Sequence, residues 1–312
     1  MNKADVISDV FTALHIRSDL YFRAHLGDAM AVRIPEERRR IRFHLLLQGA
    51  CRIAVEGAEP VPMTEGDVVL VPNGASQILS TAGATEAVPL ERLLAAGMVT
   101  DGVLSGGGPA RAVLLCGFCQ FDEGIDHPAL SSLPAMIPLS LSRLGAEPWI
   151  AATLKLLELE ANLDASGTRA ILGRLIEIIV IQATRRLTET VGEGGNGFIA
   201  ALADPSLSRA LQAIHSAPER PWRVGDLAAE TGMSRSRFAQ RFADIVGVPP
   251  MVYMTKWRLA RARALLADTQ LSIDEIARRC GYASLPSFSR RFKMQFGIGP
   301  GAFRRSGGAD AA

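Results

Sequence analysis

The sequence predicts an α+β multidomain chain, in which an N-terminal β-barrel and a pair of helices precede an all-α C-terminal region. Three observations support this prediction. Short apolar runs separated by glycine and proline turns fill the first part of the chain, strand signals stop at Glu147, and a helix-turn-helix pattern occurs twice near the C-terminus. A chain of 312 residues is long enough for two domains with separate cores.

The second helix-turn-helix pattern, residues 272–297, is the most informative stretch of the chain. Ser272 and Glu275 form a capping-box pattern, and Gly281 suits the left-handed backbone at a helix C-terminus. Phenylalanines then recur every fourth residue as one apolar stripe, while the opposite face is basic and rich in hydroxyl groups. This layout is typical of a helix-turn-helix, whose second helix enters the major groove of DNA.

The same layout occurs about fifty residues earlier, in residues 224–247. Each of the two units ends in a glycine that is followed shortly by a proline. A helix expected over residues 250–267 joins the units and, at 1.5 Å per residue, is roughly 27 Å long. A rod of that length can hold two recognition helices in successive major-groove segments, about 34 Å apart. Residues 198–217 are also expected to be helical.

Charge is distributed unevenly along the chain. The whole chain has a formal charge of +2, but residues 218–305 contain sixteen Arg or Lys and seven Asp or Glu, so this region carries +9 and the remainder −7. Neutralisation of phosphates supplies much of the affinity of DNA-binding proteins. The asymmetry therefore predicts a basic region that binds double-stranded promoter DNA, joined to a neutral or acidic sensing region.

The repeated units resemble the AraC/XylS family of transcription regulators over roughly the last ninety residues. The likeness is carried by Leu227-Ala228, Gly232-Met233-Ser234, Arg241-Phe242, Gly247, Ala277, Cys280-Gly281-Tyr282, Ser284, Phe288, Arg291-Phe292-Lys293, Phe296-Gly297, Pro300 and Phe303-Arg304. We therefore expect a sequence-specific transcription regulator and not an enzyme, with no cofactor and with RNA polymerase as a further partner.

The residues expected to contact DNA lie on the outward faces of the two predicted recognition helices. They are Arg235, Ser236, Arg237, Ala239 and Gln240 on the first helix, and Leu285, Pro286, Ser289, Arg290, Arg291 and Lys293 on the second. The resemblance implies base contacts at Ser236, Ala239, Gln240, Leu285, Pro286, Ser289 and Arg290. Arg290 and Gln240 are the strongest candidates, because arginine pairs with guanine and glutamine with adenine. The other basic residues are expected at phosphates, the alternative being that single charges are merely solvated.

The N-terminal region is expected to begin with a short amphipathic helix in residues 1–18 and to continue as strands over residues 41–47, 49–55, 67–71 and 111–121. Residues 66–77 resemble the second motif of cupins, which implies a cupin-like barrel. In metal-binding cupins this motif ends in a histidine and a histidine pair precedes it, whereas this chain has Gln77, or Ser76 if the register differs by one residue, and the single His44. We therefore expect no metal site. Arg42, His44 and Gln77 are the candidate residues for a small-molecule effector, and a structural histidine partnered by backbone is the alternative for His44.

Two helices are expected between Glu147 and Leu187. The second, residues 171–187, is apolar around most of its circumference and must be covered on more than one side. Packing within the chain and a homodimer contact both meet that need, and the family resemblance favours the dimer. The expected domains are a cupin-like sensing domain (1–145), a helical dimerisation region (146–190), a glycine-rich linker (191–197) and the DNA-binding domain (198–306).

Cys116 and Cys119 leave three interpretations open, namely an inert buried pair, a redox switch and a shared metal. Strand positions three apart point to opposite faces, so joining the two thiols would require the chain to turn or bulge at Gly117. Cys51 and Cys280 are expected to be structural.

No secretory or membrane segment is expected. The N-terminus lacks the basic start and apolar run of a signal peptide, and the apolar run around Ile178 is interrupted by polar residues. We therefore expect a cytoplasmic protein. Two rival functions remain, a metal-dependent cupin enzyme fused to a DNA-binding domain and a DNA-binding architectural protein with a purely structural barrel. The missing histidines disfavour the enzyme.

Overall fold

The structure is a computed structural model that describes residues 5–37, 39–121, 127–140, 148–163, 165–190 and 197–306. It contains two compact units. The helical unit comprises Met1–Ile16, Phe121–Leu133 and Thr184–Ala312, and the barrel unit comprises Arg17–Gln120 and Pro134–Ala183. The domain boundaries predicted at residues 145, 190 and 197 divide the chain into domains that follow one another in the sequence. These boundaries stay a prediction. Residues 191–196 of the predicted linker lie outside the described residues.

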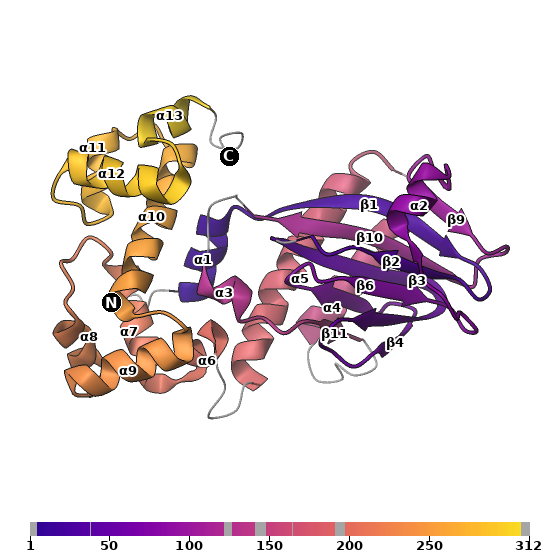
Figure 1. Ribbon diagram of the computed structural model, residues 1–312, viewed down its shortest axis with the longest axis horizontal. Coiled ribbons are helices and arrows are strands. Elements are labelled where there is room, and N and C mark those ends of the chain that lie inside the picture. The colour runs from indigo at the N-terminus through magenta and orange to yellow at the C-terminus, as the bar shows by residue number, and fades with distance from the viewer. Residues whose placement is uncertain are drawn as a thin grey trace. The chain divides into compact units, whose positions relative to one another are not determined.

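Within its described residues, the barrel unit has eleven strands in one mixed sheet (Figure 1). They are β1 (Arg17–Leu26), β2 (Ala31–Ile34), β3 (Arg40–Val55), β4 (Val61–Thr64), β5 (Val68–Val71), β6 (Gln77–Ser80), β7 (Val88–Pro89), β8 (Val99–Thr100), β9 (Val103–Gly106), β10 (Ala112–Gln120) and β11 (Ile137–Leu139). The main path runs β7-β2-β6-β3-β10-β1-β9-β8, and β4, β5 and β11 join through β3 and β5. The cupin-like fold expected for this region is confirmed.

The long strand β3 makes the sheet curl. Its first half pairs with β10 and β5, whereas its second half pairs with β4 and β6. The expected break into two strands at Gln48-Gly49 is therefore wrong. Gly49 has φ of 82°, and a Cβ there would lie 2.0 Å from the carbonyl oxygen of Arg111, so glycine allows the strand to bend beside β10 without ending it.

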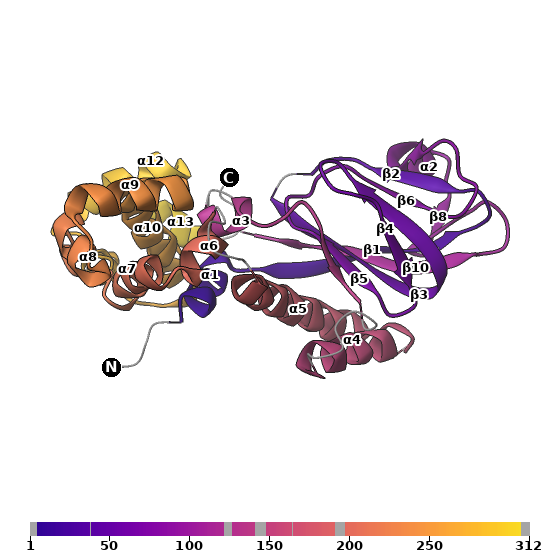
Figure 2. The ribbon, with the colours of Figure 1, turned by 90° about the horizontal axis from the view of Figure 1, so that it is seen from below.

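Helices complete the barrel unit. The short helix α2 (Leu90–Ala95) follows β7, and the helical pair α4 (Pro148–Ala161) and α5 (Thr168–Thr190) lies along one face of the sheet (Figure 2). Gly173 brings α5 close to β1, because a Cβ there would lie 2.7 Å from Oγ of Ser18. The inner face of the sheet holds a buried apolar core that includes Phe22, Leu46 and Leu114. None of the described helices is long and apolar enough to span a membrane.

The helical unit contains the remaining helices. They are α1 (Val6–Leu14), α3 (Pro128–Ser131), α6 (Phe198–Ala203), α7 (Pro205–Ser216), α8 (Val224–Thr231), α9 (Arg235–Val246), α10 (Pro250–Asp268), α11 (Ile273–Arg279), α12 (Leu285–Phe296) and α13 (Pro300–Arg305). Residues 198–217 are helical as expected and form two helices, α6 and α7. Asp204 ends α6 with an extended backbone and its carboxylate accepts hydrogen bonds from the amides of Ser206 and Leu207, so it caps α7, which begins at Pro205.

Each helix-turn-helix unit has an apolar core of its own. Phe238 and Phe242 of α9 are buried together with residues of α7, α8 and the first half of α10. Phe288 and Phe292 of α12 are buried with residues of α11, α13 and the second half of α10. The ring centroids are 5.6 Å apart in both phenylalanine pairs, with interplanar angles of 60° and 58°. The internal repeat in the sequence is therefore also a repeat in packing.

Candidate functional site

The two recognition helices, α9 and α12, are built alike. Each has twelve residues and begins after a serine, Ser234 or Ser284, whose hydroxyl accepts a hydrogen bond from the third amide of the helix at 3.4 Å. Each ends at a glycine with positive φ, Gly247 at 84° and Gly297 at 77°. Figure 2 shows α9 and α12 on the same side of α10. Both helices can therefore face one side of a DNA duplex.

The predicted DNA-contact residues lie on the surface of these helices, opposite the phenylalanine stripes. Arg235, Ser236, Arg237 and Gln240 of α9 are exposed, as are Leu285, Pro286, Arg290, Arg291 and Lys293 of α12, and Ala239 and Ser289 are half-buried. The basic residues of this set form no ion pair with any described residue, so their charges remain available for phosphates or bases. Their contacts with DNA stay a prediction.

Gln240 differs from Arg290 in a way that the sequence does not reveal. Its amide nitrogen donates a hydrogen bond to Oδ1 of Asp244, one turn along α9, at 2.7 Å. A glutamine that reads adenine needs its amide group free to form two hydrogen bonds with the base. Contact with a base therefore requires Gln240 to give up the bond to Asp244, whereas Arg290 has no such partner among the described residues.

The connecting helix α10 holds the two units in place. It has nineteen residues, which correspond to roughly 28 Å at 1.5 Å per residue. Arg258 of α10 donates hydrogen bonds to the carbonyl oxygens of Pro218 at 2.7 Å and Arg220 at 2.8 Å, which fixes the loop before α8. Gly281, at φ of 76°, lies against the same guanidinium, where a Cβ would approach it to 2.6 Å. A side chain at position 281 would thus disturb both units.

The three candidate effector residues come together inside the barrel. Arg42 and His44 lie on β3 and Gln77 on β6, and each is at most 2% exposed. Nη2 of Arg42 donates to Glu37 at 2.8 Å, and Nδ1 of His44 lies 3.1 Å from Sγ of Cys116. Among the described residues, Nε and Nη1 of Arg42, Nε2 of His44 and both amide atoms of Gln77 have no hydrogen-bond partner. Such orphaned groups are costly in an apolar interior.

The His44 imidazole is neutral in this environment. Burial lowers its pKa to about 3, the charge of Arg42 acts in the same direction, and Gln77 opposes both. Gln77 is therefore close enough to affect His44, although its amide lacks the geometry of a hydrogen bond to the ring. No group of three or more His, Cys, Asp or Glu in the described residues could hold a metal ion.

A polar cluster next to these residues has no signal in the sequence. The Tyr21 hydroxyl donates to Glu37 at 2.6 Å and accepts from Arg40 at 2.6 Å. Burial opposes ionisation of Glu37, but hydrogen bonds from Tyr21 and Arg42 and the charge of Arg40 outweigh it and lower the pKa of the carboxyl. The carboxylate of Glu37 therefore holds Arg42 in place. Strand alternation could not reveal this cluster, because Glu37 lies in a loop.

The chain matches two families, one described as Cupin over residues 5–189 and one described as Helix-turn-helix domain over residues 227–306. The HTH-type transcriptional regulator AlkR of Acinetobacter baylyi is 29% identical over 306 residues, which cover 96% of this chain and 99% of AlkR. An AraC-like transcription regulator of Streptomyces lividans is 30% identical over 302 residues, which cover 96% of this chain and 98% of that protein. This chain belongs to the AraC-like transcription regulators.

The AraC-like regulator is thus a protein that binds double-stranded DNA and regulates transcription, as its sequence predicted. Its N-terminal region is cupin-like. Among solved structures, the DNA-binding domain of AdpA in complex with a target DNA is 33% identical, with a TM-score of 0.31 and coverage of 33% of this chain and 92% of that chain.

The cysteines of the regulator are buried and free. Cys116 belongs to the inner core of the barrel, whereas Cys119 is outside that core and close enough to Glu177 of α5 for the carboxylate to affect its pKa. Burial raises the pKa of both thiols far above the usual range, and that of Cys51 to about 12. Thiols of this kind are protonated at neutral pH and lack the thiolate that reacts with oxidants.

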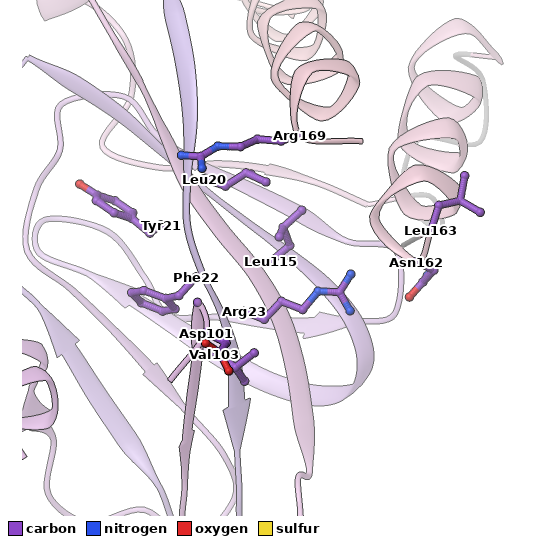
Figure 3. Close-up of a pocket in the computed structure, with 11 residues that line it drawn as sticks. Leu20, Tyr21, Phe22, Arg23, Asp101, Val103, Leu115, Asn162, Leu163 and Arg169 are labelled. Carbon is purple, nitrogen blue, oxygen red and sulfur yellow. The ribbon is translucent and has the colours of Figure 1, made fainter. Parts of the chain in front are cut away.

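The barrel unit of the regulator also has an open groove of about 600 Å³ beside β1, and residues at the C-terminal end of α4 and the N-terminal end of α5 line its other side (Figure 3). It is lined by Leu20, Tyr21, Phe22, Arg23, Asp101, Gly102, Val103, Leu115, Asn162, Leu163 and Arg169. Arg23 donates to the carbonyl oxygen of Ala161, and Arg169 pairs with Asp19. Both cations in the groove thus already have protein partners, and no sequence motif pointed to this groove.

Proposed function

We propose that the regulator reads two successive major-groove segments of a promoter, one with α9 and one with α12, and that an effector in the barrel changes its hold on DNA. The observation that supports this proposal is the repeat itself, two recognition helices of equal length and equal caps on the same side of α10. Successive segments of the major groove recur about every 34 Å. Two recognition helices carried by the same helix α10 fit two segments of the major groove better than a single segment.

Within this proposal, the exposed side chains divide into base readers and phosphate binders. Arg290, whose guanidinium has no partner among the described residues, reads guanine, and the remaining base edges are lined by Ser236, Ala239, Gln240, Leu285, Pro286 and Ser289. Arg235, Arg237, Arg291 and Lys293 bind phosphates. Because Gln240 must first release Asp244, it contributes less to discrimination than Arg290.

The experiment compares two neighbouring cations of α12 on a set of operator variants. Arg290→Ala should lower affinity for the preferred sequence by about 1 to 3 kcal/mol and relax preference at a single position. Lys293→Ala should weaken binding to all sequences alike and reduce the salt dependence by about one phosphate contact. If both variants weakened every sequence uniformly, the division into base readers and phosphate binders would be wrong.

The effector site in this proposal is the barrel interior around Arg42, His44 and Gln77. Its support is the set of buried donors and acceptors without protein partners, together with the cationic guanidinium of Arg42. A small molecule with a carboxylate or another strong acceptor would satisfy the donors of Arg42 and Gln77, and a hydroxyl group on the same molecule could donate to Oε1 of Gln77. A library of small carboxylates should contain compounds that raise the melting temperature of the wild type but not of Gln77→Leu. Equal shifts in both proteins would place the binding site elsewhere.

A homodimer through α4 and α5 is part of the same proposal. Leu156 and Leu159 of α4 are 49% and 54% exposed and lie three residues apart, on one face of the helix, and Leu163, shortly after the helix, is 53% exposed. Ile171 and Ile178 of α5 are also close to half exposed. Exposed apolar side chains on both helices of the pair fit a second copy of the chain. Leu159→Asp should therefore shift the protein from dimer to monomer in analytical ultracentrifugation, and the control Leu94→Asp, on the isolated exposed leucine of α2, should not.

We further propose that the regulator is not an enzyme and acts with RNA polymerase. Its relatives over nearly the full length are transcription regulators, which supports a role at promoters. A protein bound at a promoter affects transcription through the polymerase, and the cytoplasm is where the promoter DNA of such regulators lies. The test is transcription in vitro by RNA polymerase from a promoter that carries the operator selected by the chain. A change in the amount of transcript when the purified chain is added would support this role, and an unchanged amount would contradict it.

A further inference from the structure

The N-terminal helix α1 is part of the core of the first helix-turn-helix unit. Val6, Val10, Ala13 and Leu14 are each at most 5% exposed and belong to the same buried cluster as Phe238 and Phe242 of α9, Leu211 of α7 and Trp257 of α10. These four residues recur at helical spacing, so one whole face of α1 is covered. Residues 5–16 therefore belong structurally with the recognition helices.

Polar contacts fasten α1 to α7. Oδ2 of Asp9 lies 3.3 Å from Nδ1 of His215, and Nε2 of the same ring lies 2.7 Å from the hydroxyl of Tyr253 on α10. Burial lowers the pKa of His215 and keeps its ring neutral, although Asp9 opposes this shift. A ring that donates from Nδ1 to Asp9 and accepts at Nε2 from Tyr253 satisfies all three groups. The ring also stacks on Trp257, at 3.9 Å and 22°.

A second contact fastens the other end of α1 to the far end of α10. Nε2 of His15, which caps α1 with a φ of 46°, lies 3.0 Å from Oδ2 of Asp268. Asp268 is the last residue of α10, shortly before α11 and the second helix-turn-helix unit. The two polar contacts thus join α7, which supports the first unit, to the end of the helix that carries the second.

We propose that α1 is a brace that sets the distance and angle between the two recognition helices, and that Asp9 and His15 are positioning residues for DNA reading. A single helix of nineteen residues bends, and long helices curve unless they are held. Successive major-groove segments lie at a fixed separation, so a bent α10 cannot place both α9 and α12 correctly. α1 is attached to α10 directly through His15 and Asp268, and indirectly through the bond from Asp9 to His215 and from His215 to Tyr253, and this attachment opposes the bending.

The brace is also continuous with the barrel. His15 and Ile16 connect α1 to β1, and Arg17 at the start of β1 pairs with Gln120 at the end of β10. Beyond β10, His127 precedes α3 and lies edge-on to Phe198, Tyr253 and Trp257 of the helical unit, with centroid distances of 5.0, 5.5 and 6.3 Å. β1 thus follows α1 directly in the sequence.

The test measures how affinity depends on operator spacing. The probe is a duplex that the full-length chain selects from a random pool, compared with the same duplex after two base pairs are added between its two segments. The wild type should lose about tenfold in affinity for the altered spacing, and Asp9→Ala/His15→Ala about threefold or less, because a flexible α10 distinguishes the spacings poorly. Asp9→Asn, which still accepts from His215, should behave as the wild type, and so should the control Glu59→Gln on an exposed loop.

The inference rests on the proposed reading of two groove segments, and the outcomes of the test distinguish a failure of the brace from a failure of two-segment reading. A wild type that is indifferent to spacing would contradict two-segment reading. A wild type that prefers one spacing, with the same preference in the double variant, would overturn the brace alone. Circular dichroism checks the fold. If the double variant does not fold, Asp268→Ala removes the second contact from a side chain that is 57% exposed, and its spacing preference decides the question.

Discussion

The two helix-turn-helix units of the regulator present similar recognition helices on unequal cores. Of the described residues, twenty-one are buried in the core of the first unit, with contributions from α1, α3, α6 and α7, and nine are buried in the core of the second. Both units cap their recognition helices with serine and end them with glycine. The shape of the two recognition helices therefore depends on local sequence, whereas the stability of each unit depends on what packs behind its helix.

The largest expected effect is a core truncation. Phe242→Ala and Phe292→Ala each remove a fully buried ring and should cost about 3 to 5 kcal/mol. In the small second core this cost should open α11 and α12 locally, whereas in the first core it should weaken the helical unit as a whole. Hydrogen exchange measured along the chain separates these patterns. Equal loss of protection in both units of Phe292→Ala would contradict unequal cores.

Acid should weaken the first unit selectively. His127 is buried there, burial lowers its pKa to about 3, and the chain has no histidine after His215. In the unfolded chain the His127 ring is protonated below about pH 6.5, whereas in the folded chain it stays neutral down to about pH 3. The free energy of unfolding is therefore highest above pH 6.5 and decreases as the pH falls below that value. Between pH 7 and pH 5 the loss is about 2 kcal/mol for one such histidine.

Hydrogen exchange of the helical unit at pH 7 and pH 5 measures this effect, and His127→Gln should reduce the pH dependence in the first unit. Burial also lowers the pKa of His215, so part of the dependence should remain in that variant. If protection of α11 and α12 fell as steeply as that of α7 and α8, histidine burial would not be the cause.

The smallest expected effect concerns the helix caps. Ser234→Ala and Ser284→Ala each remove a hydroxyl that accepts a backbone hydrogen bond at 3.4 Å, and each should cost about 1 kcal/mol. Because the caps are alike, the two costs should agree in chemical denaturation. A cap that mattered in only one unit would show that the likeness of the recognition helices is superficial.

The sequence predicted features that depend on neighbouring residues and missed those that depend on distant ones. The phenylalanine stripe at 288, 292 and 296 and the glycine at 281 set local structure, so α11 and α12 were predicted closely. Gln48-Gly49 has the composition of a turn, yet pairing with β10 keeps β3 continuous. Tertiary packing of this kind outweighs local propensity.

The same distinction holds for the sites. Exposure of the residues predicted to contact DNA follows from helical periodicity and could be expected, and Arg42, His44 and Gln77 were candidates because they are the polar groups nearest the predicted strands. The bond between Gln240 and Asp244, the carboxylate of Glu37 behind Arg42 and the contact between Asp9 and His215 join side chains whose orientation or partners no sequence pattern specifies. Such contacts are decided by the fold.

The central claim is that one chain reads two groove segments with α9 and α12. Selection of the full-length regulator on random duplexes, followed by footprinting of the selected sequences, tests it most directly. The account predicts two protected segments whose centres lie about one helical turn, 10 to 10.5 base pairs, apart on one side of the duplex. It also predicts that Arg290→Ala relaxes one of these segments and leaves the other intact. A single protected segment for each chain, or no preference over random duplex, would contradict it.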